Sequence, residues 1–514
     1  MNFLKKRNFR YGSLAVLLTV SVIAVVVAVN LIVSTLATNF GWFFDMTSEN
    51  MYELSDESKK LLDRVDKNSD VTVYFLTEPD RLTSGVQSSN YFGQATAWGM
   101  KPIHEIATEI SAGYPFVKIE YLNYAKNPQK LREITGKDYD GITFQSTQII
   151  VDSVSRTTGT DGTVYDTAHN YRIFSRDAFY TFGEAGNVSS FCGDYRFAAA
   201  IGSLTLPNGS APVAYFITGH GEKVGSYDSG STEKNTDYSS AQSLYQILRD
   251  CGYDIRKIDL KYEDFGKEDD ALAVVYSPST DFLAPENSDS FNETEKLNLF
   301  LKEKNHSLMV FLDPGTRKLS NLENFLKEKC GVTAVDAKVA DDGANAVSVD
   351  RLSFAGKAGG ASVASRIAGG YAADKKVIFS SVRPLIIDND AKSTSAIYEV
   401  PDSVSDKELL GAALMTLTET ESGSQIAICG TSDFVGDSYT GNPDYANREV
   451  MLETVAGISE AARVPTGVSF KTVMTDRLDI TNRQAFILTV VLSAGIPLVF
   501  ACAGIIVYLR RRYS

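Results

Sequence analysis

The residues of this chain best suited to chemistry lie in one short stretch, residues 213–222, with the sequence VAYFITGHGE. Its first six residues are apolar, β-branched or aromatic, which predicts a buried parallel strand that ends in a tight turn. In that turn His220 offers a titratable base and Glu222 a carboxylate. Gly219 and Gly221 would let the backbone adopt positive φ angles and approach a ligand closely.

Two interpretations of this turn stay open. In one, it is a βα loop at the carboxyl end of a strand, where open α/β sheets build their ligand crevice. In the other, it is a glycine-rich turn in which His220 and Glu222 only cap and hydrogen-bond locally. On the first interpretation we expect Gly221→Val to strain the turn, and His220→Ala to cost less stability but weaken function.

Polar residues also follow three later predicted strands. Ser277 and Pro278 follow 271–276, Asp313 follows 308–312, and a polar Gly-Thr-Ser-Asp stretch follows 426–429. Because the carboxyl ends of parallel strands share one edge of a sheet, these loops would line one crevice. The predicted ligand-binding or coupling residues are Gly219, His220, Gly221, Glu222, Asp313, Ser432 and Asp433.

The sequence predicts no catalytic residue, metal site or cofactor. No nucleophile stands beside His220, and the motif holds no second histidine to complete a metal site. The stretch 430–434 lacks the second glycine of a G-x-S-x-G elbow, and no G-x-x-x-x-G-K-[ST] motif is present. The cysteines are scattered without a C-x-x-C pair, which is typical of buried free thiols. They are Cys192, Cys251, Cys330, Cys429 and Cys502.

Two uncharged apolar segments, 14–37 and 485–509, are each long enough to cross a bilayer. Both lack ionisable residues, so neither resembles an ion or substrate path. The first is longer than the apolar core of a signal peptide and is read as an uncleaved anchor, although Thr35-Leu36-Ala37 keeps cleavage open as an alternative.

Charge predicts the topology. The tails 1–13 and 510–514 carry seven of the 50 basic residues and no acid, which places both termini in the cytoplasm and 38–484 outside the cell membrane. The remaining 43 basic residues face 64 acidic ones, a net charge of −21. Such an acidic body argues against nucleic acid as a partner.

Alternating strand and helix patterns across 38–484 predict an α/β fold with a doubly wound, mainly parallel sheet. We expect a first extracytoplasmic α/β unit over 38–206 and a second over 211–460, separated by the linker Pro207-Asn208-Gly209-Ser210. Residues 334–376 are rich in glycine, alanine and serine and are interpreted as an insertion. Residues 461–484 are interpreted as a stalk that leads back to the membrane.

Several motifs resemble the GldG-like family, auxiliary components of ABC-type transport systems named from a gliding-motility transporter. They are ITGHGE at 217–222 with LYQIL at 244–248 and Gly252-Tyr253, MTSENMYELSDESKKLL at 46–62, FSSVR at 379–383, and CGTSDF at 429–434 with Gly441-Asn442. The resemblance covers roughly residues 40–510. It implies an extracytoplasmic domain similar to flavodoxin-like and class I glutamine-amidotransferase-like folds.

The resemblance also implies association with an ABC permease subunit and a cytoplasmic ATPase subunit. We therefore expect a non-catalytic, membrane-anchored subunit that binds a small ligand or glycan or couples its partners. A membrane-anchored extracellular hydrolase or amidase and a surface adhesin remain as alternatives. Loss of a turnover on His220→Ala would favour the hydrolase, and binding without an ATPase partner would favour the adhesin.

Overall fold

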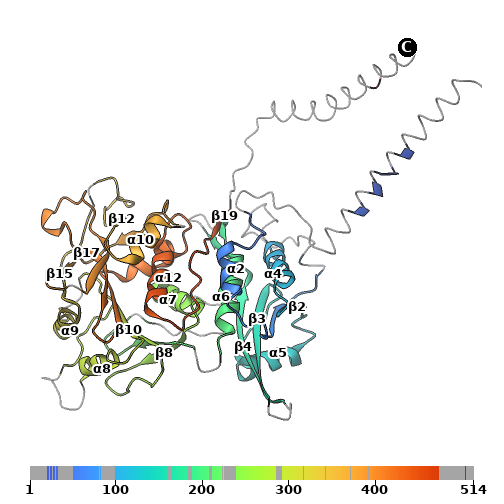
Figure 1. Ribbon diagram of the computed structural model, residues 1–514, viewed down its shortest axis with the longest axis horizontal. Helices are drawn as coiled ribbons and strands as arrows, with labels where there is room; N and C mark the ends of the chain where they lie inside the picture. The colour runs from blue at the N-terminus through green and yellow to red at the C-terminus, as the bar shows by residue number, and fades with distance from the viewer. Residues whose placement is uncertain are drawn as a thin grey trace, which may run out of the picture. The chain divides into compact units, whose positions relative to one another are not determined.

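The computed structural model describes residues 50–79, 99–158, 164–182, 188–207, 211–222, 239–284, 292–315, 318–341, 343–370, 372–391 and 393–473, together with isolated positions. The chain divides into two compact units, Met1–Thr472 and Val473–Ser514. Every element named below belongs to the first unit (Figure 1).

A four-stranded sheet forms the N-terminal part, in the order β2-β1-β3-β4. β1 pairs in parallel with β2 and antiparallel with β3, which pairs antiparallel with β4. α5 packs on one face against Tyr74 and Ile150. Because side chains alternate along a strand, the neighbouring residues face the other side, where α4 and α6 contact the strands. The bounds are α2 (Asp56–Leu62), β1 (Val71–Phe75), α4 (Lys101–Gly113), β2 (Val117–Tyr121), α5 (Pro128–Thr135), β3 (Gln148–Thr158), β4 (Val164–Ser175) and α6 (Gly193–Leu204).

A ten-stranded sheet forms the second part, and five of its strands are parallel. In spatial order these are β8 (Asp254–Ile258), β7 (Val213–Ile217), β9 (Ala271–Tyr276), β10 (His306–Phe311) and β18 (Gln425–Cys429). The other five pair antiparallel, and they are β11 (Val332–Ala334), β13 (Lys357–Ala358), β15 (Leu385–Ile387), β16 (Thr394–Glu399) and β17 (Ala413–Glu419).

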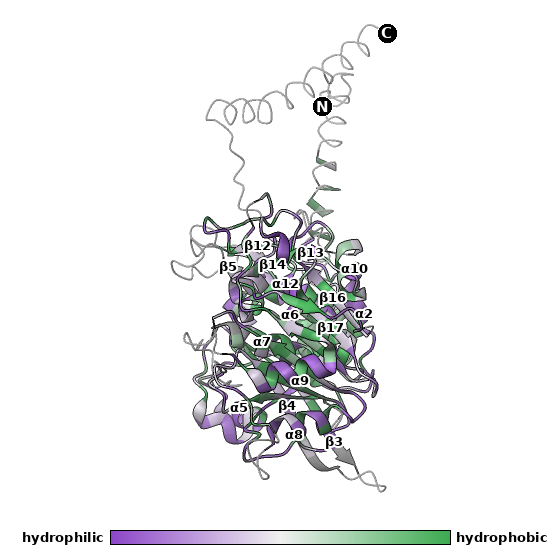
Figure 2. Cartoon of the chain, turned by 90° about the vertical axis from the view of Figure 1, so that its left-hand side faces the viewer, coloured by the Kyte–Doolittle hydropathy of each residue, from purple (hydrophilic) through white to green (hydrophobic). Residues whose placement is uncertain are grey.

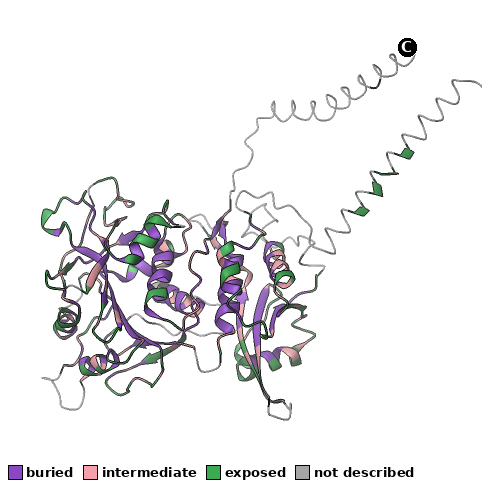
Figure 3. Ribbon diagram, in the orientation of Figure 1, coloured by how far each residue is buried: buried purple, intermediate pink, exposed green. Residues whose placement is uncertain are grey.

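Helices cover both faces of the parallel strands. α7 (Ser239–Asp250) and α12 (Asn447–Ile458) lie side by side on one face, and α8 (Glu293–Phe300) and α9 (Ser320–Cys330) cover the other (Figure 1). The strands between them are apolar and buried, and the outer faces of α8 and α9 include exposed residues, whereas α12 is buried over most of its length (Figures 2 and 3). Burial on both faces explains why β7, β9 and β10 consist of buried residues throughout.

The α/β class predicted from the sequence is confirmed, but a mainly parallel sheet describes only half of the larger sheet. β17 ends at Glu419 and β18 begins at Gln425, and so short a turn can join only antiparallel strands. The 334–376 segment contributes to the core rather than lying outside it, because Phe354, Val363 and Ile367 are buried in the α12-side cluster. The first residues of the predicted stalk also pack on the folded unit, where Val464 and Val468 are buried.

The remaining elements are short. They are η2 (Gly136–Gly141), η3 (Arg176–Phe179), β5 (Tyr180–Phe182), β6 (Val188–Phe191), β12 (Ser353–Ala355), α10 (Ser362–Gly369), β14 (Ile378–Ser380), η6 (Lys407–Leu409), η7 (Ser432–Val435), α11 (Asp437–Thr440) and β19 (Lys471–Thr472).

The two predicted membrane spans, 14–37 and 485–509, lie outside the described residues apart from isolated positions. Among the residues that the structure describes, no helix has the length and apolar character needed to cross a bilayer.

One buried carboxylate joins the two sheets. Asp250, at the end of α7, accepts hydrogen bonds from Arg172 Nη1 of β4 at 3.1 Å and from Arg196 Nη1 of α6 at 2.9 Å. The side chains of Asp250 and Arg172 are only 2% and 7% exposed. Gln246 Nε2 donates to the same carboxylate at 2.7 Å. Removal of Asp250 would leave two guanidinium groups without their carboxylate at this junction.

We expect Asp250→Ala to lower the unfolding free energy of the detergent-solubilised chain by about 3–5 kcal/mol, the usual cost of breaking a buried ion pair. Denaturant unfolding measures it. The matched control is Asp254→Ala, because Asp254 is half exposed and pairs with Arg256 on the surface. Equal effects of the two variants would show that Asp250 does not join the sheets.

Candidate functional site

The turn after β7 has the backbone geometry that its glycines predicted. Gly219 and Gly221 adopt φ angles of 110° and 76°. The His220 carbonyl accepts from Ser279 N at 2.8 Å and from Thr280 N at 2.9 Å, in the loop after β9. A Cβ on Gly221 would collide with the Ser279 hydroxyl. The turn is therefore fastened to the neighbouring loop, and only glycine fits at position 221.

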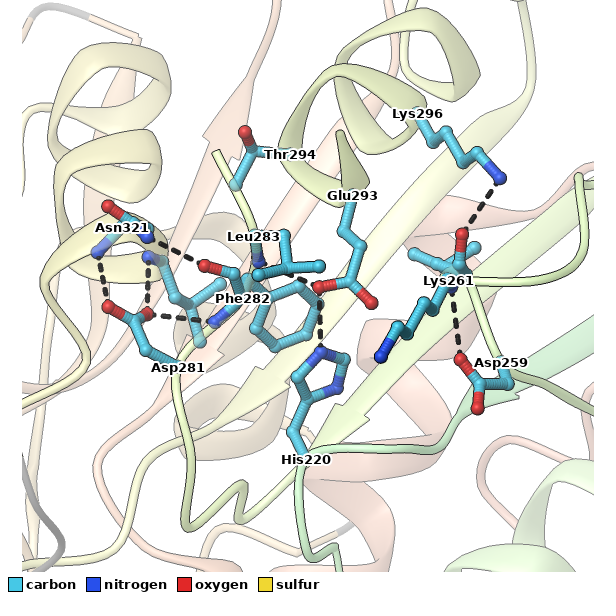
Figure 4. Close-up of polar contacts among 12 residues, drawn as sticks. His220, Asp259, Lys261, Asp281, Phe282, Leu283, Glu293, Thr294, Lys296 and Asn321 are labelled. Atoms are coloured by element: carbon cyan, nitrogen blue, oxygen red, sulfur yellow. Dashed lines mark hydrogen bonds and ion pairs between the residues drawn. The ribbon is translucent and has the colours of Figure 1, made fainter. Parts of the chain in front are cut away.

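His220 is buried and held by two carboxylates. Its Nδ1 lies 2.9 Å from Glu222 Oε1 and its Nε2 lies 3.0 Å from Glu293 Oε2 (Figure 4 shows the Glu293 contact). The His220 backbone N–H also donates to Glu222 Oε2 at 2.8 Å. The three side chains are 5%, 1% and 3% exposed. We call His220, Glu222 and Glu293 the His220 triad.

Electrostatics keep the imidazole of the triad charged. Burial lowers the pKa of His220, but its hydrogen bonds to Glu222 and Glu293 outweigh this effect and raise the pKa to about 9. Burial raises the pKa of Glu293, yet the hydrogen bonds from His220 and from Leu283 N bring it below its ordinary value. With both nitrogens donating, His220 has no lone pair left to take a proton or bind a metal.

Phe282 closes the triad from one side. Its ring stacks on the imidazole with a centroid separation of 3.9 Å and an interplanar angle of 6° (Figure 4). Asp281 holds this loop in place, since its carboxylate accepts from Asn321 N at 2.8 Å and Leu322 N at 3.2 Å at the start of α9. A flat aromatic ring over an imidazolium adds a cation–π contact to the two ion pairs.

Sequence reasoning missed Glu293, which lies 73 positions from His220. A signal was present, because Asn292-Glu293 opens a helix and Asn292 caps it by accepting from Glu295 N at 3.0 Å. Acidic residues in a first helical turn are common, however, and they usually face solvent and favour the helix dipole. Only the packing of α8 beside β7 shows that Glu293 points inward.

Asp313 and Ser432 form a second cluster at the same sheet edge. Asp313 Oδ1 accepts from Ser432 N at 2.6 Å, and Asp313 Oδ2 accepts from Ser432 Oγ at 2.8 Å and from Ser277 Oγ at 2.5 Å. These residues follow β10, β18 and β9, which are neighbouring strands. The prediction that these strand ends meet is confirmed by these contacts. Their carboxylate and hydroxyl groups, however, are used to join the loops to one another.

The other predicted site residues lie more openly. Gly219, Gly221 and Asp433 are exposed, and Asp433 N donates to Thr431 Oγ1 at 3.2 Å in a local turn. The seven predicted residues thus fall into the triad turn, the Asp313 cluster and an exposed Asp433. The loop that contains Ser277 and Ser279 touches the first two of these groups.

The described cysteines are buried and protonated. Burial raises the pKa of Cys429, at the end of β18, to about 12 and that of Cys330 to about 11, and it also raises the pKa values of Cys192 and Cys251. A nucleophilic cysteine needs a lowered pKa and access to substrate. Within the described ranges, no three His, Cys, Asp or Glu side chains are grouped so that they could hold a metal ion.

Comparisons with known proteins add little to this geometry. No protein-family model matches the chain, and no curated protein matches it. Among solved structures the chain is similar to one described as the mmIFT52 N-terminal domain, at 14% identity over 48% of this chain and 96% of that chain, with a TM-score of 0.35. So loose an overlay supports no conclusion about fold or function.

We expect Gly221→Ala to lower the unfolding free energy by about 2–4 kcal/mol, through strain at positive φ and the collision with Ser279. Gly411→Ala is the matched control, since Gly411 has a φ of 82° with no neighbour within 4 Å of an added Cβ. Melting of both variants measures the difference. If Gly221→Ala costs no more than Gly411→Ala, the loop after β9 does not hold the turn.

The triad also predicts a pH dependence. A raised histidine pKa stabilises the fold fully below the ordinary value of 6.5 and loses this effect as the pH rises through about 9. The stability advantage of the wild type over His220→Gln should therefore fall by about 2–3 kcal/mol between pH 6 and pH 9.5. Denaturant titrations at both pH values measure it, and an advantage that rises with pH would contradict the triad.

The expectation that His220→Ala costs less than a substitution at Gly221 is revised by this geometry. Without the imidazolium, Glu222 and Glu293 would face each other as buried carboxylates, at a cost of about 3–5 kcal/mol. The contact of His220 with Glu222 is local, as the second interpretation of the turn expects, whereas its contact with Glu293 joins the turn to α8.

Proposed function

We propose that this protein is a non-catalytic subunit of an ABC-type transport system, anchored in the cell membrane by 14–37 and 485–509 with its α/β body outside. The His220 triad supports the proposal that the subunit is non-catalytic. Both imidazole nitrogens donate to carboxylates, so the one histidine of the strand-end loops is committed to structure. The buried, protonated cysteines support the same conclusion.

The parallel half of the larger sheet supports the proposal. Numbered along the chain, the parallel strands β8, β7, β9, β10 and β18 lie in the order 2-1-3-4-5, the order of flavodoxin-like sheets. The motif ITGHGE spans the end of β7 and the triad turn, and CGTSDF spans the end of β18 and Ser432. Both motifs thus hold strand ends in place at one edge, where a ligand or partner subunit would bind.

The anchoring part of the proposal rests on sequence. Both segments are uncharged and flanked by basic tails. Isolated described positions of the first segment are helical and expose apolar side chains, among them Val20, Val25 and Leu31 at 59%, 60% and 63%. Exposed aliphatic side chains along a helix are suited to contact with lipid.

The subunit proposal is tested by purifying the tagged full-length chain in mild detergent and identifying what accompanies it by mass spectrometry. We expect a permease and an ATPase subunit at stoichiometric amounts. The control is the same chain without residues 485–514, which should lose both while the body remains folded. A chain that purifies alone, or that shows a hydrolytic turnover abolished by His220→Gln, would contradict the proposal.

The topology is tested separately with protease added to intact cells that express the chain with a tag at either end. We expect both tags to be protected while the body is cleaved, since the basic tails favour the cytoplasmic side. Cleavage sites are available in the exposed loop around Lys261 and Lys267. Protection of the body, or loss of either tag, would contradict the two-pass arrangement.

A further inference from the structure

Residues 463–472, which we call the strap, lie outside any helix and run back along the beginning of the folded body. Arg463 Nη1 donates to the carbonyl of Arg64 at 3.3 Å, and an added Cβ on Gly467 would lie 2.7 Å from Glu57. Further along, Lys471 Nζ donates to the carbonyl of Asn50 at 2.9 Å. The strap therefore runs antiparallel to residues 50–64, and the two ends of the body meet at Asn50 and Lys471.

Lys471 acts as the fastening of the strap. Its side chain is 10% exposed and its ammonium lies 3.6 Å from Asp194 Oδ2, at the start of α6. It also donates to the carbonyl of Glu53. The fully buried Asp194 accepts from Ser55 N at 3.3 Å and from Ser58 Oγ at 3.4 Å. The backbone of Lys471 pairs with Phe191 of β6, so β19 closes the end of the strap (Figure 1).

The strap covers an arginine at the start of α12. The Arg448 guanidinium lies 3.3 Å from the ring centroid of Phe470 and 4.8 Å from that of Tyr195, and its Nη2 donates to the Val468 carbonyl at 3.4 Å. The side chains of Arg448 and its ion-pair partner Glu449 are 6% and 3% exposed, with 2.9 Å between Nη2 and Oε1.

Four polar atoms under the strap are buried without a hydrogen-bond partner: Arg448 Nε, Arg448 Nη1, Glu449 Oε2 and Tyr195 Oη. A buried polar atom left unpaired destabilises the state that buries it, because the atom would be hydrated if it were exposed. The closed strap therefore buries the apolar side chains of Val468 and Phe470, which stabilises it. It also buries polar atoms whose hydration would lower the free energy of the open state.

We infer that the strap is a movable cover, which unfastens at Lys471 and lifts from Arg448 and Tyr195 while the two sheets stay folded. Such local opening costs less free energy than global unfolding, because it exposes only the strap and the residues beneath it. The strap continues directly into the residues that precede the second predicted span. If the proposed membrane anchoring holds, a pull from that span reaches β19 and Lys471 before the rest of the strap.

Hydrogen exchange of the full-length chain in detergent, followed by mass spectrometry, tests the inference. Lys471→Met removes the ammonium but keeps the aliphatic chain, and we expect at least about tenfold faster exchange in 463–472 and in β6, with β9 and β10 unchanged. Gly467→Ala, at a φ of 82° and close to Glu57, should act in the same direction. Gly457→Ala is the control, because an added Cβ there meets nothing within 4 Å.

Tyr195→Phe separates a cover from an ordinary packed segment. It removes only the unpartnered hydroxyl and keeps the ring that packs on Phe470 at a centroid distance of 5.3 Å. If the hydroxyl is hydrated only when the strap lifts, exchange in 463–472 should slow several-fold. Exchange that is unchanged or faster in Tyr195→Phe, or that rises in β9 and β10 together with the strap in Lys471→Met, would overturn the inference. None of these readouts depends on transport, so they can fail independently of the proposed function.

Discussion

The pairing of buried carboxylates with cations that come from distant parts of the chain is the constraint on which this structure depends. A carboxylate loses hydration when it is buried and must recover that free energy from fixed partners. Asp250 recovers it from Arg172 and Arg196 and so joins α7 to the smaller sheet. Asp194 is paired in the same way with Lys471 of the strap, and Glu293 with His220 in the turn after β7. Each pairing fixes the position of one element relative to another through directional contacts, which apolar packing lacks.

At the edge of the larger sheet where the parallel strands end, such pairing makes polar side chains unavailable for catalysis while it holds the loops in place. A histidine near a carboxylate can serve as a catalytic base when one nitrogen stays free. His220 has carboxylates on both nitrogens and an aromatic ring on its face, so its proton is held rather than exchanged. Asp313 is similarly occupied by Ser277 and Ser432. The backbone around Gly219 and Gly221 is exposed at this edge, and it is better suited to binding than to catalysis.

The strap runs along the beginning of the folded body and, in the sequence, leads toward the second apolar segment. Lys471 fastens its end, and it covers Arg448, whose Nε and Nη1 have no hydrogen-bond partner. The α6 helix carries Asp194 at its start and Arg196 close by, so the contacts that fasten the strap and the contacts that join the sheets lie on one helix.

The sequence by itself determined the α/β class, most strand and helix positions and the meeting of strand ends at one edge, because these follow from local hydrophobic periodicity and turn chemistry. The run 213–217 consists of apolar and aromatic residues, and it forms β7 with both faces buried. Ser55 caps α2 by accepting from Ser58 N, which is the usual role of a serine before an acidic first turn. The membrane spans and domain boundaries remain predictions, since the spans fall outside the described residues.

Only the tertiary structure decided the rest. The pairing of β11 with β15, the inward direction of Glu293 and the return of 463–472 along α2 all depend on contacts between residues far apart in the chain. Periodicity reports which face of an element is apolar, but not which element will cover it. For His220 the sequence was equally compatible with a ligand-binding loop and with a locally hydrogen-bonded turn. Only the fold shows that α8 brings a second carboxylate, Glu293, to the imidazole.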